Sequence, residues 1–300
     1  MRLSVIVPVH NERANIGPFY ERARPVLDSM NGLDAWNIVF VNDASEDGSF
    51  AEILKLRELD RRVHVITLSR RFGYHGVLMA GLSKVESDLY TMVDVDCEDP
   101  PELLGKFYEA IRGGAQVAYG VRSNREEPAV ITLGRKLYYL LNRSIADGEF
   151  VIWMAEFAMI TKQVRDAIIA PHTTYPFLRA ELGYVGFKRV GIPYFRAKRQ
   201  HGKSHYNILN MTKFAIAAIL SSSTFLLRFV VYLAIVLGAA FPLTALFFGM
   251  TRTSVATLAV ILSLYFLLIS VPLISLYLAR TYKNVVSRPV FVIDQEQTFL

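Results

Sequence analysis

The stretch LYTMVDVDCEDPPEL (89–103) decides the fold, because it places a dense group of acids where a buried strand ends. Apolar residues run up to Asp94, and the carboxylates of Asp94, Asp96, Glu98 and Asp99 follow within six positions. Like charges this close repel, so at least one carboxyl stays protonated unless a cation or donor groups offset the repulsion. The stretch therefore indicates a binding site at the end of a strand.

The first 120 residues alternate apolar runs with helical patterns, which predicts an α/β fold with a mostly parallel sheet covered on both faces. The expected strands are 3–9, 36–42, 63–69, 89–95 and 116–122. The expected helices lie near 14–29, 49–60, 74–86 and 100–112. Residues 123–205 are less regular, with helical patterns near 131–146 and 161–170 and a strand near 185–195.

Polar side chains follow every one of these five strands. Ligands of such sheets bind outside the carboxyl ends of the strands, so we expect the site there. The side chains at this edge are His10, Asn11, Glu12, Asn42, Asp43, Ser45, Arg70, Arg71, Asp94, Asp96 and Arg122.

Asp94 and Asp96 are two positions apart, so on an extended backbone they face the same side. Paired hard oxygen donors suit Mg²⁺ or Mn²⁺, which are commonly held by carboxylates together with substrate phosphates. The segment Asp99-Pro100-Pro101-Glu102 is predicted to begin a helix, with Asp99 as its cap. No glycine-rich dinucleotide fingerprint and no Walker A lysine motif occur, which disfavours dehydrogenases and P-loop enzymes.

The window from Phe229 to Ala279 holds a single charged residue, Arg252. Its two apolar stretches, 229–250 and 254–279, each exceed the ~20 residues that a helix needs to cross a bilayer. We predict a transmembrane hairpin, the alternative being two buried core helices. Before it, 206–225 is expected to form an amphipathic interfacial helix. The chain then divides into a catalytic domain (1–205), an interfacial region (206–228), the spans (229–279) and a cytoplasmic tail (280–300).

Basic residues crowd around the hairpin, which by the positive-inside rule places both termini in the cytoplasm. They are Arg196, Lys198, Arg199, Lys203, Lys213 and Arg228 before it, and Arg280, Lys283 and Arg288 after it. Because of this crowding, the net charge of +6 suits an anionic membrane surface better than nucleic acid. The single cysteine, Cys97, allows no internal disulfide, as expected in a reducing compartment.

Five segments, in this order, resemble the family 2 glycosyltransferases with the GT-A fold: SVIVPVHNE (4–12), VNDASEDGS (41–49), LSRRFGYHGVLMAGL (68–82), MVDVDCEDPPELL (92–104) and YGVR (119–122). Together with FLRAELGYVGFKRVGIPYFRAKRQHGKSHY (177–206) and the hairpin, they resemble the polyprenyl-phosphate glycosyltransferases. These include dolichol-phosphate mannose synthases and the bacterial enzymes that load glucose or aminoarabinose onto undecaprenyl phosphate. The resemblance covers roughly residues 3–290.

The resemblance implies a metal-dependent, inverting transfer of one sugar from a nucleoside diphosphate sugar, by default a uridine diphosphate sugar, to polyprenyl phosphate. It places this activity at the cytoplasmic face of a bacterial inner membrane, in a multi-pass and homo-oligomeric protein. Two alternatives stay open. One is a glycosyltransferase acting on a glycan or glycolipid hydroxyl, which would need a competent base. The other is a non-catalytic scaffold that binds nucleotide sugar.

The resemblance also implies roles for residues on the donor side. Base and ribose contacts fall to Pro8, His10, Asn11 and Glu12, with His10 in place of the usual tyrosine. The nucleobase element matches Val41, Asn42, Asp43, Ala44 and Ser45, where Asp43 contacts the base and Ala44 departs from the usual glycine. The D-x-D motif matches Asp94, Val95 and Asp96, which hold the diphosphate and the metal, and Glu98 can join the metal shell.

On the phosphate and acceptor side, the implied residues are Arg71, Arg122, Arg135, Arg199, Ser204 and His205. His205 stands where the family has lysine, so that phosphate contact is expected to depend on pH. The family's Asp-Phe-Arg triplet becomes Glu156-Phe157-Ala158. Because the nucleophile is an already anionic phosphate oxygen, Glu156 is expected to orient the acceptor more than to act as a base. Asp96 and Glu156 are the expected catalytic carboxylates.

Overall fold

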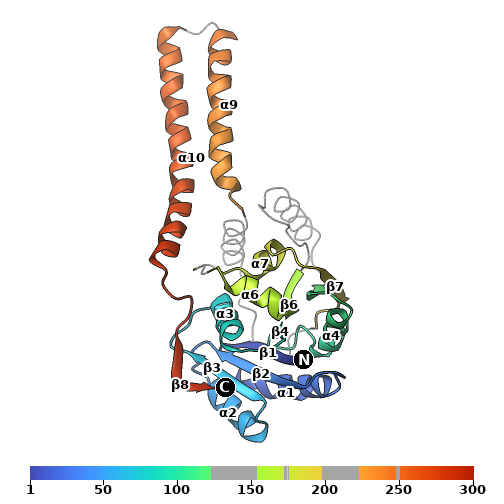
Figure 1. Ribbon diagram of the computed structural model, residues 1–300. Coiled ribbons are helices and arrows are strands. Elements are labelled where there is room, and N and C mark those ends of the chain that lie inside the picture. The colour runs from blue at the N-terminus through green and yellow to red at the C-terminus, as the bar shows by residue number, and fades with distance from the viewer. Residues whose placement is uncertain (123–153, 172–173, 175, 198–222, 248–250) are drawn as a thin grey trace.

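The computed structural model describes residues 1–122, 154–171, 174, 176–197, 223–247 and 251–300 (Figure 1). Its core is a sheet in the order β7-β5-β6-β4-β1-β2-β3-β8. The strands are β1 (Arg2–Val9), β2 (Ala35–Asn42), β3 (Val63–Leu68), β4 (Leu89–Met92), β5 (Val117–Arg122), β6 (Met154–Thr161), β7 (Arg189–Tyr194) and β8 (Ile293–Phe299). The four central strands β4, β1, β2 and β3 run parallel, as predicted.

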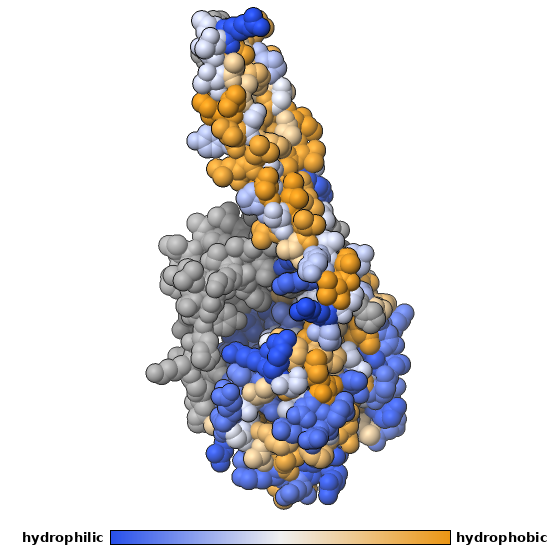
Figure 2. Space-filling model, turned by 90° about the vertical axis from the view of Figure 1, so that its left-hand side faces the viewer, coloured by the Kyte–Doolittle hydropathy of each residue, from blue (hydrophilic) through white to orange (hydrophobic). Residues whose placement is uncertain are grey.

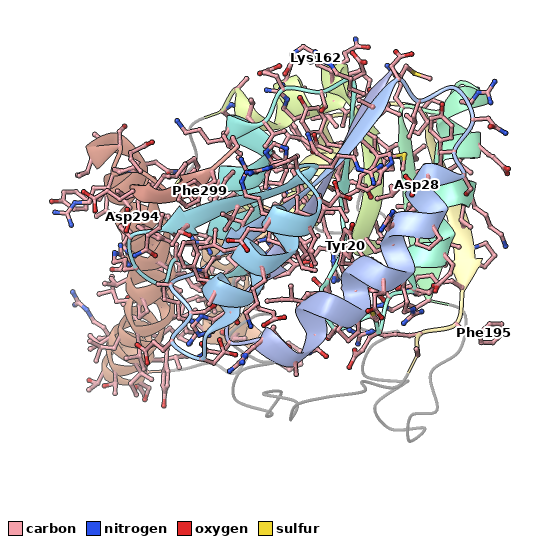
Figure 3. All side chains as sticks on the ribbon, turned by 90° about the horizontal axis from the view of Figure 1, so that it is seen from below. Tyr20, Asp28, Lys162, Phe195, Asp294 and Phe299 are labelled. Carbon is pink, nitrogen blue, oxygen red and sulfur yellow. The ribbon has the colours of Figure 1, made fainter. Side chains whose placement is uncertain are left out.

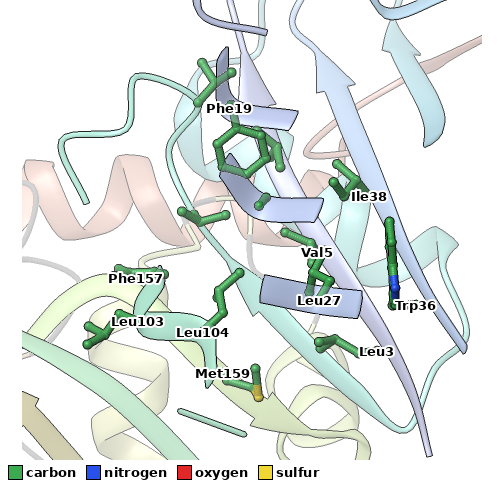
Figure 4. Packing of buried hydrophobic residues seen from close by; sticks show 14 of the residues in the cluster. Leu3, Val5, Phe19, Leu27, Trp36, Ile38, Leu103, Leu104, Phe157 and Met159 are labelled. Atoms are coloured by element: carbon green, nitrogen blue, oxygen red, sulfur yellow. The ribbon is translucent and has the colours of Figure 1, made fainter. Parts of the chain in front are cut away.

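Helices cover both faces of the sheet because its strands are apolar on both sides. One face is covered by α1 (Arg13–Asp28), α2 (Ser49–Leu59) and α4 (Leu104–Arg112), and a 3₁₀ turn (Pro101–Leu103) precedes α4. The other face is covered by α3 (Tyr74–Lys84), α6 (Lys162–Ile169) and α7 (Leu178–Tyr184). Figure 4 shows Phe19 and Leu27 of α1 packed over Val5 and Ile38 of the sheet.

Two strands were not predicted. β6 is apolar apart from Glu156 and Thr161, so it lacks the period-two alternation of a half-buried strand, and it pairs antiparallel with both β4 and β5. β8 carries polar residues because it is an edge strand, antiparallel to β3. Figure 3 shows Asp294 and Phe299 of β8 at the opposite side of the molecule from Phe195, which follows β7.

The two apolar stretches form long helices, α9 (Phe225–Phe247) and α10 (Arg252–Val286), that project from the α/β domain side by side (Figure 1). Both are long and apolar enough to cross a membrane. Figure 2 shows apolar surface along much of this pair. No side chain of α9 and only Ser270 of α10 is buried, so the structure disfavours the alternative of two core helices. Most of the expected interfacial helix, 206–222, lies outside the described residues.

Gly81 lets α3 lie close against the sheet. A Cβ atom at this position would stand 2.5 Å from Cγ2 of Ile6 and 3.2 Å from Cγ2 of Val41. We expect Gly81→Ala to destabilise the protein by about 1–3 kcal/mol, because overpacking moves side chains and backbone in a filled core. The midpoint of thermal unfolding in detergent measures the effect.

Gly105 in α4 provides the matched control, because a Cβ there would meet no atom within 4 Å. Gly105→Ala should hold or raise the midpoint, since alanine is the better helix former by roughly 1 kcal/mol. Equal midpoints for the Gly81→Ala variant and the parent would contradict the close packing of α3.

Candidate active site

The loops after β1 and β2 are joined to each other at the carboxyl edge of the sheet. His10 Nδ1 lies 2.9 Å from the carbonyl oxygen of Asp43. The Asn11 amide donates to Ser45 Oγ at 3.1 Å, and the Glu46 amide donates to Asn11 Oδ1 at 2.8 Å. The structure therefore brings together His10, Asn11, Asp43 and Ser45, which were all predicted to lie on the donor side.

Asp43 connects β2 to the loop after β3. Its side chain is buried, and its two oxygens accept the backbone amides of Phe72 at 2.7 Å and Gly73 at 2.9 Å. This fixes the segment that carries Arg70, which lies 4.1 Å over the Phe72 ring, and the exposed Arg71. A nucleobase contact by Asp43 stays a prediction, since the carboxylate already holds this loop.

The valines of the two donor motifs point into the hydrophobic core. Val41 is fully buried and Val95 nearly so. A contact of either residue with a ligand would therefore go through the backbone. Pro8 is half-buried near the end of β1, and Glu12 precedes α1, where its backbone amide donates to Ser49 Oγ at 3.1 Å.

Three residues other than glycine adopt left-handed backbone conformations at this edge. They are Asn11 (φ 56°), Ala44 (φ 50°) and Cys97 (φ 56°), one after each of β1, β2 and β4. For Ala44 and Cys97 the conformation is strained, whereas asparagine tolerates it better. Ala44 thus keeps the conformation that favours glycine, although the side chain is not glycine.

Asp94 lies in a group of acids. It accepts a hydrogen bond from the Tyr74 hydroxyl at 2.9 Å. Burial, together with the nearby charges of Asp99, Asp96 and Glu156, raises the pKa of Asp94 to about 7. A cation bound here would offset this repulsion, so the donor set fits a divalent metal. The sequence analysis expected Asp94 and Asp96 on an extended strand. Instead, β4 ends at Met92, and both residues lie in the loop that follows it.

The metal ligands predicted from the sequence do not form a closed protein cage. In the described part of the chain, no group of three or more His, Cys, Asp or Glu side chains is arranged to hold a metal. Asp96 Oδ1 accepts the Glu98 amide at 3.1 Å. The Glu98 carboxylate lies 2.5 Å from Nη2 of Arg196, so a metal contact by Glu98 stays a prediction.

The prediction that Asp99 caps a helix is wrong. Pro100 occupies the cap position of the 3₁₀ turn, and no side chain caps it. Asp99 is instead buried, and Arg122 Nη2 donates to it at 3.1 Å. Arg122 Nε also donates to the Tyr194 hydroxyl at 3.0 Å. Phosphate binding by Arg122 stays a prediction, because this guanidinium is already held within the protein.

Glu156, on β6, lies beside the acidic group, where its charge acts on both Asp94 and Tyr74. Its Oε1 is 3.4 Å from Nε of Arg179. This ion pair holds the Glu156 carboxylate in place, which fits the orienting role expected for it.

Sequence reasoning missed three residues of the site: Tyr74, Arg179 and Tyr194. Tyr74 stands inside a motif that was recognised, RRFGYHG (70–76), so its position could have suggested a role. Arg179 and Tyr194 reach the site only through tertiary packing. Arg135, Arg199, Ser204 and His205 lie outside the described residues.

Comparison with known proteins agrees with this fold. Residues 4–168, more than half of the chain, match the family model for glycosyl transferase family 2. A prophage-derived bactoprenol glucosyl transferase of Shigella flexneri is 30% identical over 98% of both chains. An undecaprenyl-phosphate 4-deoxy-4-formamido-L-arabinose transferase of Edwardsiella ictaluri is 26% identical over 97% of this chain and 93% of its own.

The fold is also that of a solved structure, the glucosyl-3-phosphoglycerate synthase of Mycobacterium tuberculosis in complex with Mn²⁺, uridine diphosphate glucose and glycerol 3-phosphate. It is 18% identical, covers 73% of this chain and 79% of its own, and superposes with a TM-score of 0.51. The molecule is therefore a GT-A enzyme domain carrying two membrane-type helices. The chain belongs to glycosyltransferase family 2, which confirms the resemblance found in its motifs.

The strain at Ala44 gives a direct test of the site's backbone. We expect Ala44→Gly to stabilise the protein by about 0.5–1 kcal/mol, because glycine removes a left-handed penalty of roughly 1–2 kcal/mol at some cost in chain entropy. The same substitution at Ala51, inside α2, should destabilise by about 1 kcal/mol. Thermal unfolding measures both, and a drop in both variants would contradict the left-handed turn.

Proposed function

We propose that this protein transfers a single sugar from a uridine diphosphate sugar to a polyprenyl phosphate, with the help of a divalent metal and with inversion at the sugar. The observation that carries the proposal is a cluster of acidic side chains at the carboxyl edge of a GT-A sheet, in one chain with two exposed apolar helices. The acidic cluster would bind a soluble nucleotide sugar through a metal, and the hairpin of α9 and α10 would hold the site at a membrane.

The acceptor follows from the helices and the relatives together. Two full-length relatives are named for bactoprenol or undecaprenyl phosphate, although their names give different sugars. A polyprenyl tail cannot leave a bilayer without a cost of ~0.8 kcal/mol per methylene. An enzyme that uses it must therefore work at the headgroup plane, where α9 and α10 would hold this domain.

The donor and metal follow from the acids. Asp94 and Asp96 would hold Mg²⁺ or Mn²⁺ together with the donor diphosphate, and Glu98 is a further candidate ligand. Once bound, the metal supplies Lewis-acid stabilisation of the departing diphosphate. The solved structure with the same fold holds Mn²⁺ and uridine diphosphate glucose, which supports this choice of donor and metal.

Side chains of the protein would bind the nucleoside, the phosphates and the acceptor. The loop fixed by Asp43, together with His10, Asn11 and Ser45, would receive the nucleoside. Arg71 and Arg122 would add positive charge near the phosphates, joined by Arg135, Arg199, Ser204 and His205. Glu156, paired with Arg179, would orient the acceptor. The attacking phosphate oxygen is already anionic at neutral pH, so no strong base is required, and attack opposite the leaving group inverts the anomeric centre.

The reaction is tested with protein purified in detergent, Mn²⁺, undecaprenyl phosphate and a panel of radiolabelled nucleotide sugars. We expect one donor to yield labelled lipid, and Asp96→Ala to lower the rate at least about a hundredfold through loss of charge stabilisation. Asp166→Asn, an exposed carboxylate of α6, is the control and should keep the parental rate. Transfer to a saccharide hydroxyl and none to the lipid would contradict the proposed acceptor.

The proposed topology places both ends of the hairpin in the cytoplasm. In a Cys97→Ser background, Thr253→Cys at the start of α10 should react with a membrane-impermeant maleimide on spheroplasts, whereas Ser287→Cys at its end should react only after lysis. The expectation rests on the excess of arginine and lysine at the domain side of the helices. Labelling of Ser287→Cys on intact spheroplasts would reverse the orientation.

A further inference from the structure

One buried carboxylate, that of Asp99, collects three donors. Arg122 Nη2 lies 3.1 Å from its Oδ2, and Arg196 Nε lies 3.5 Å from its Oδ1. The Tyr194 hydroxyl also donates to it. Asp99 is only 2% exposed, so its charge would be costly to bury without these partners.

The donors come from parts of the chain that flank the D-x-D turn. Asp99 follows Asp96 by three residues, whereas Arg122 ends β5 and Tyr194 ends β7. Arg196 also pairs with Glu98 at 2.5 Å, and the Ala197 amide donates to the Glu98 carbonyl at 2.9 Å. The turn that carries Asp96 is thus fastened to the ends of two strands.

Packing leaves Tyr194 little freedom. Its ring lies over Gly120 of β5, where a Cβ atom would approach ring carbon Cε1 to 2.6 Å. The Phe157 ring meets it edge to face at 6.0 Å. The hydroxyl is therefore held where it can accept from Arg122 Nε and donate to Asp99.

Arg122 is oriented by these two partners and keeps some donors for a ligand. Tyr194 accepts from Nε and Asp99 accepts from Nη2, whereas the two N–H groups on Nη1 take no part in these two hydrogen bonds. A guanidinium fixed in this way binds a phosphate oxygen better than a flexible guanidinium does, since less side-chain freedom is lost on binding.

We propose that Asp99 is a positioning residue of the transfer reaction, holding Arg122 in its working orientation toward phosphate oxygens. The proposal rests on the proposed function and deepens it. Because Asp99 holds the Arg122 guanidinium in place, a phosphate ligand does not have to order this side chain on binding. Tyr194 and Gly120 serve the same arrangement from β7 and β5.

A similar trio elsewhere in the protein provides the control. Arg165 Nη2 lies 2.7 Å from the Glu86 carboxylate and also donates to the Tyr90 hydroxyl. Glu86 precedes β4, so this trio lies at the amino end of the strand whose carboxyl end leads to the site. It shares the residue types of the Asp99 group but not its place in the site.

The experiment is a double-mutant cycle of Asp99→Asn and Arg122→Gln, measured as kcat and KM for the donor with Mn²⁺ and undecaprenyl phosphate. We expect Asp99→Asn to lower kcat at least tenfold with KM within threefold. The double variant should be no slower than Arg122→Gln alone, because a residue that acts through Arg122 has no effect without it. Glu86→Gln should keep kcat within twofold. The proposal would be overturned if the loss of kcat in the double variant equalled the product of the two single-variant losses. An unchanged kcat in Asp99→Asn would also overturn it.

Two milder variants keep the proposal testable if Asp99→Asn fails to fold. Tyr194→Phe removes one hydroxyl, and Gly120→Ala displaces the Tyr194 ring while every charged group stays. Both should lower kcat at least threefold, and neither should slow the Arg122→Gln variant further. Parental kcat in both would overturn the proposal. Thermal midpoints of the metal-free proteins supply a readout independent of activity, in which Asp99→Asn and Arg122→Gln should be less than additive.

Failure of the proposed function gives a different result. If the parent protein forms no lipid product with any donor, the acceptor assignment falls. The cycle is then measured as the affinity of UDP in the presence of Mn²⁺. A tenfold loss in Asp99→Asn that disappears in the Arg122→Gln background would still support the positioning role, and equal affinities would overturn it.

Discussion

Electrostatic repulsion among clustered carboxylates is the constraint on which this site depends. The charges of Asp99, Asp96 and Glu156 all act on Asp94, and together with burial they raise the pKa of Asp94 to about 7. The protein offsets part of this repulsion with its own donors, since Asp99 is matched by Arg122 and Glu156 by Arg179. Asp94 accepts a hydrogen bond from the Tyr74 hydroxyl and forms no ion pair within the described part of the chain, so it is the carboxylate that we propose for the metal.

The scaffold that maintains this arrangement is a set of short connections between strand ends. Asp43 joins β2 to the loop after β3, while His10 and Asn11 join the loops after β1 and β2. The membrane-type helices are fastened to the same sheet, because α10 runs into the segment before β8, where the Ser69 amide donates to the carbonyl of Val292 at 2.9 Å. The hairpin and the loop after β3 therefore share one edge of the molecule.

Much of the fold could be predicted because its signals are local. The parallel strands β1 to β4 are apolar runs between helical patterns, and the spans are long stretches with almost no charge. β6 and β8 were missed for opposite reasons. β6 is apolar apart from Glu156 and Thr161 and so shows no strand period, and β8 is too polar to suggest burial, so only their pairing partners define them. The end of β4 was placed three residues late, because Val93 and Val95 continue the apolar run into a turn that ends in a left-handed Cys97.

The enzyme family, the acidic motif and the membrane-type helices can all be recognised in the amino-acid sequence, because each depends on residues that are neighbours along the chain. The pairing of the charges, by contrast, depends on contacts between residues far apart along the chain. Asp99 looked like a helix cap beside two prolines, yet its carboxylate meets residues that lie 23 and 95 positions away, Arg122 and Tyr194. Such partners are chosen by which strands become neighbours in the sheet and by the space that Gly120 leaves for a tyrosine ring. Neither property can be read from a local stretch of sequence.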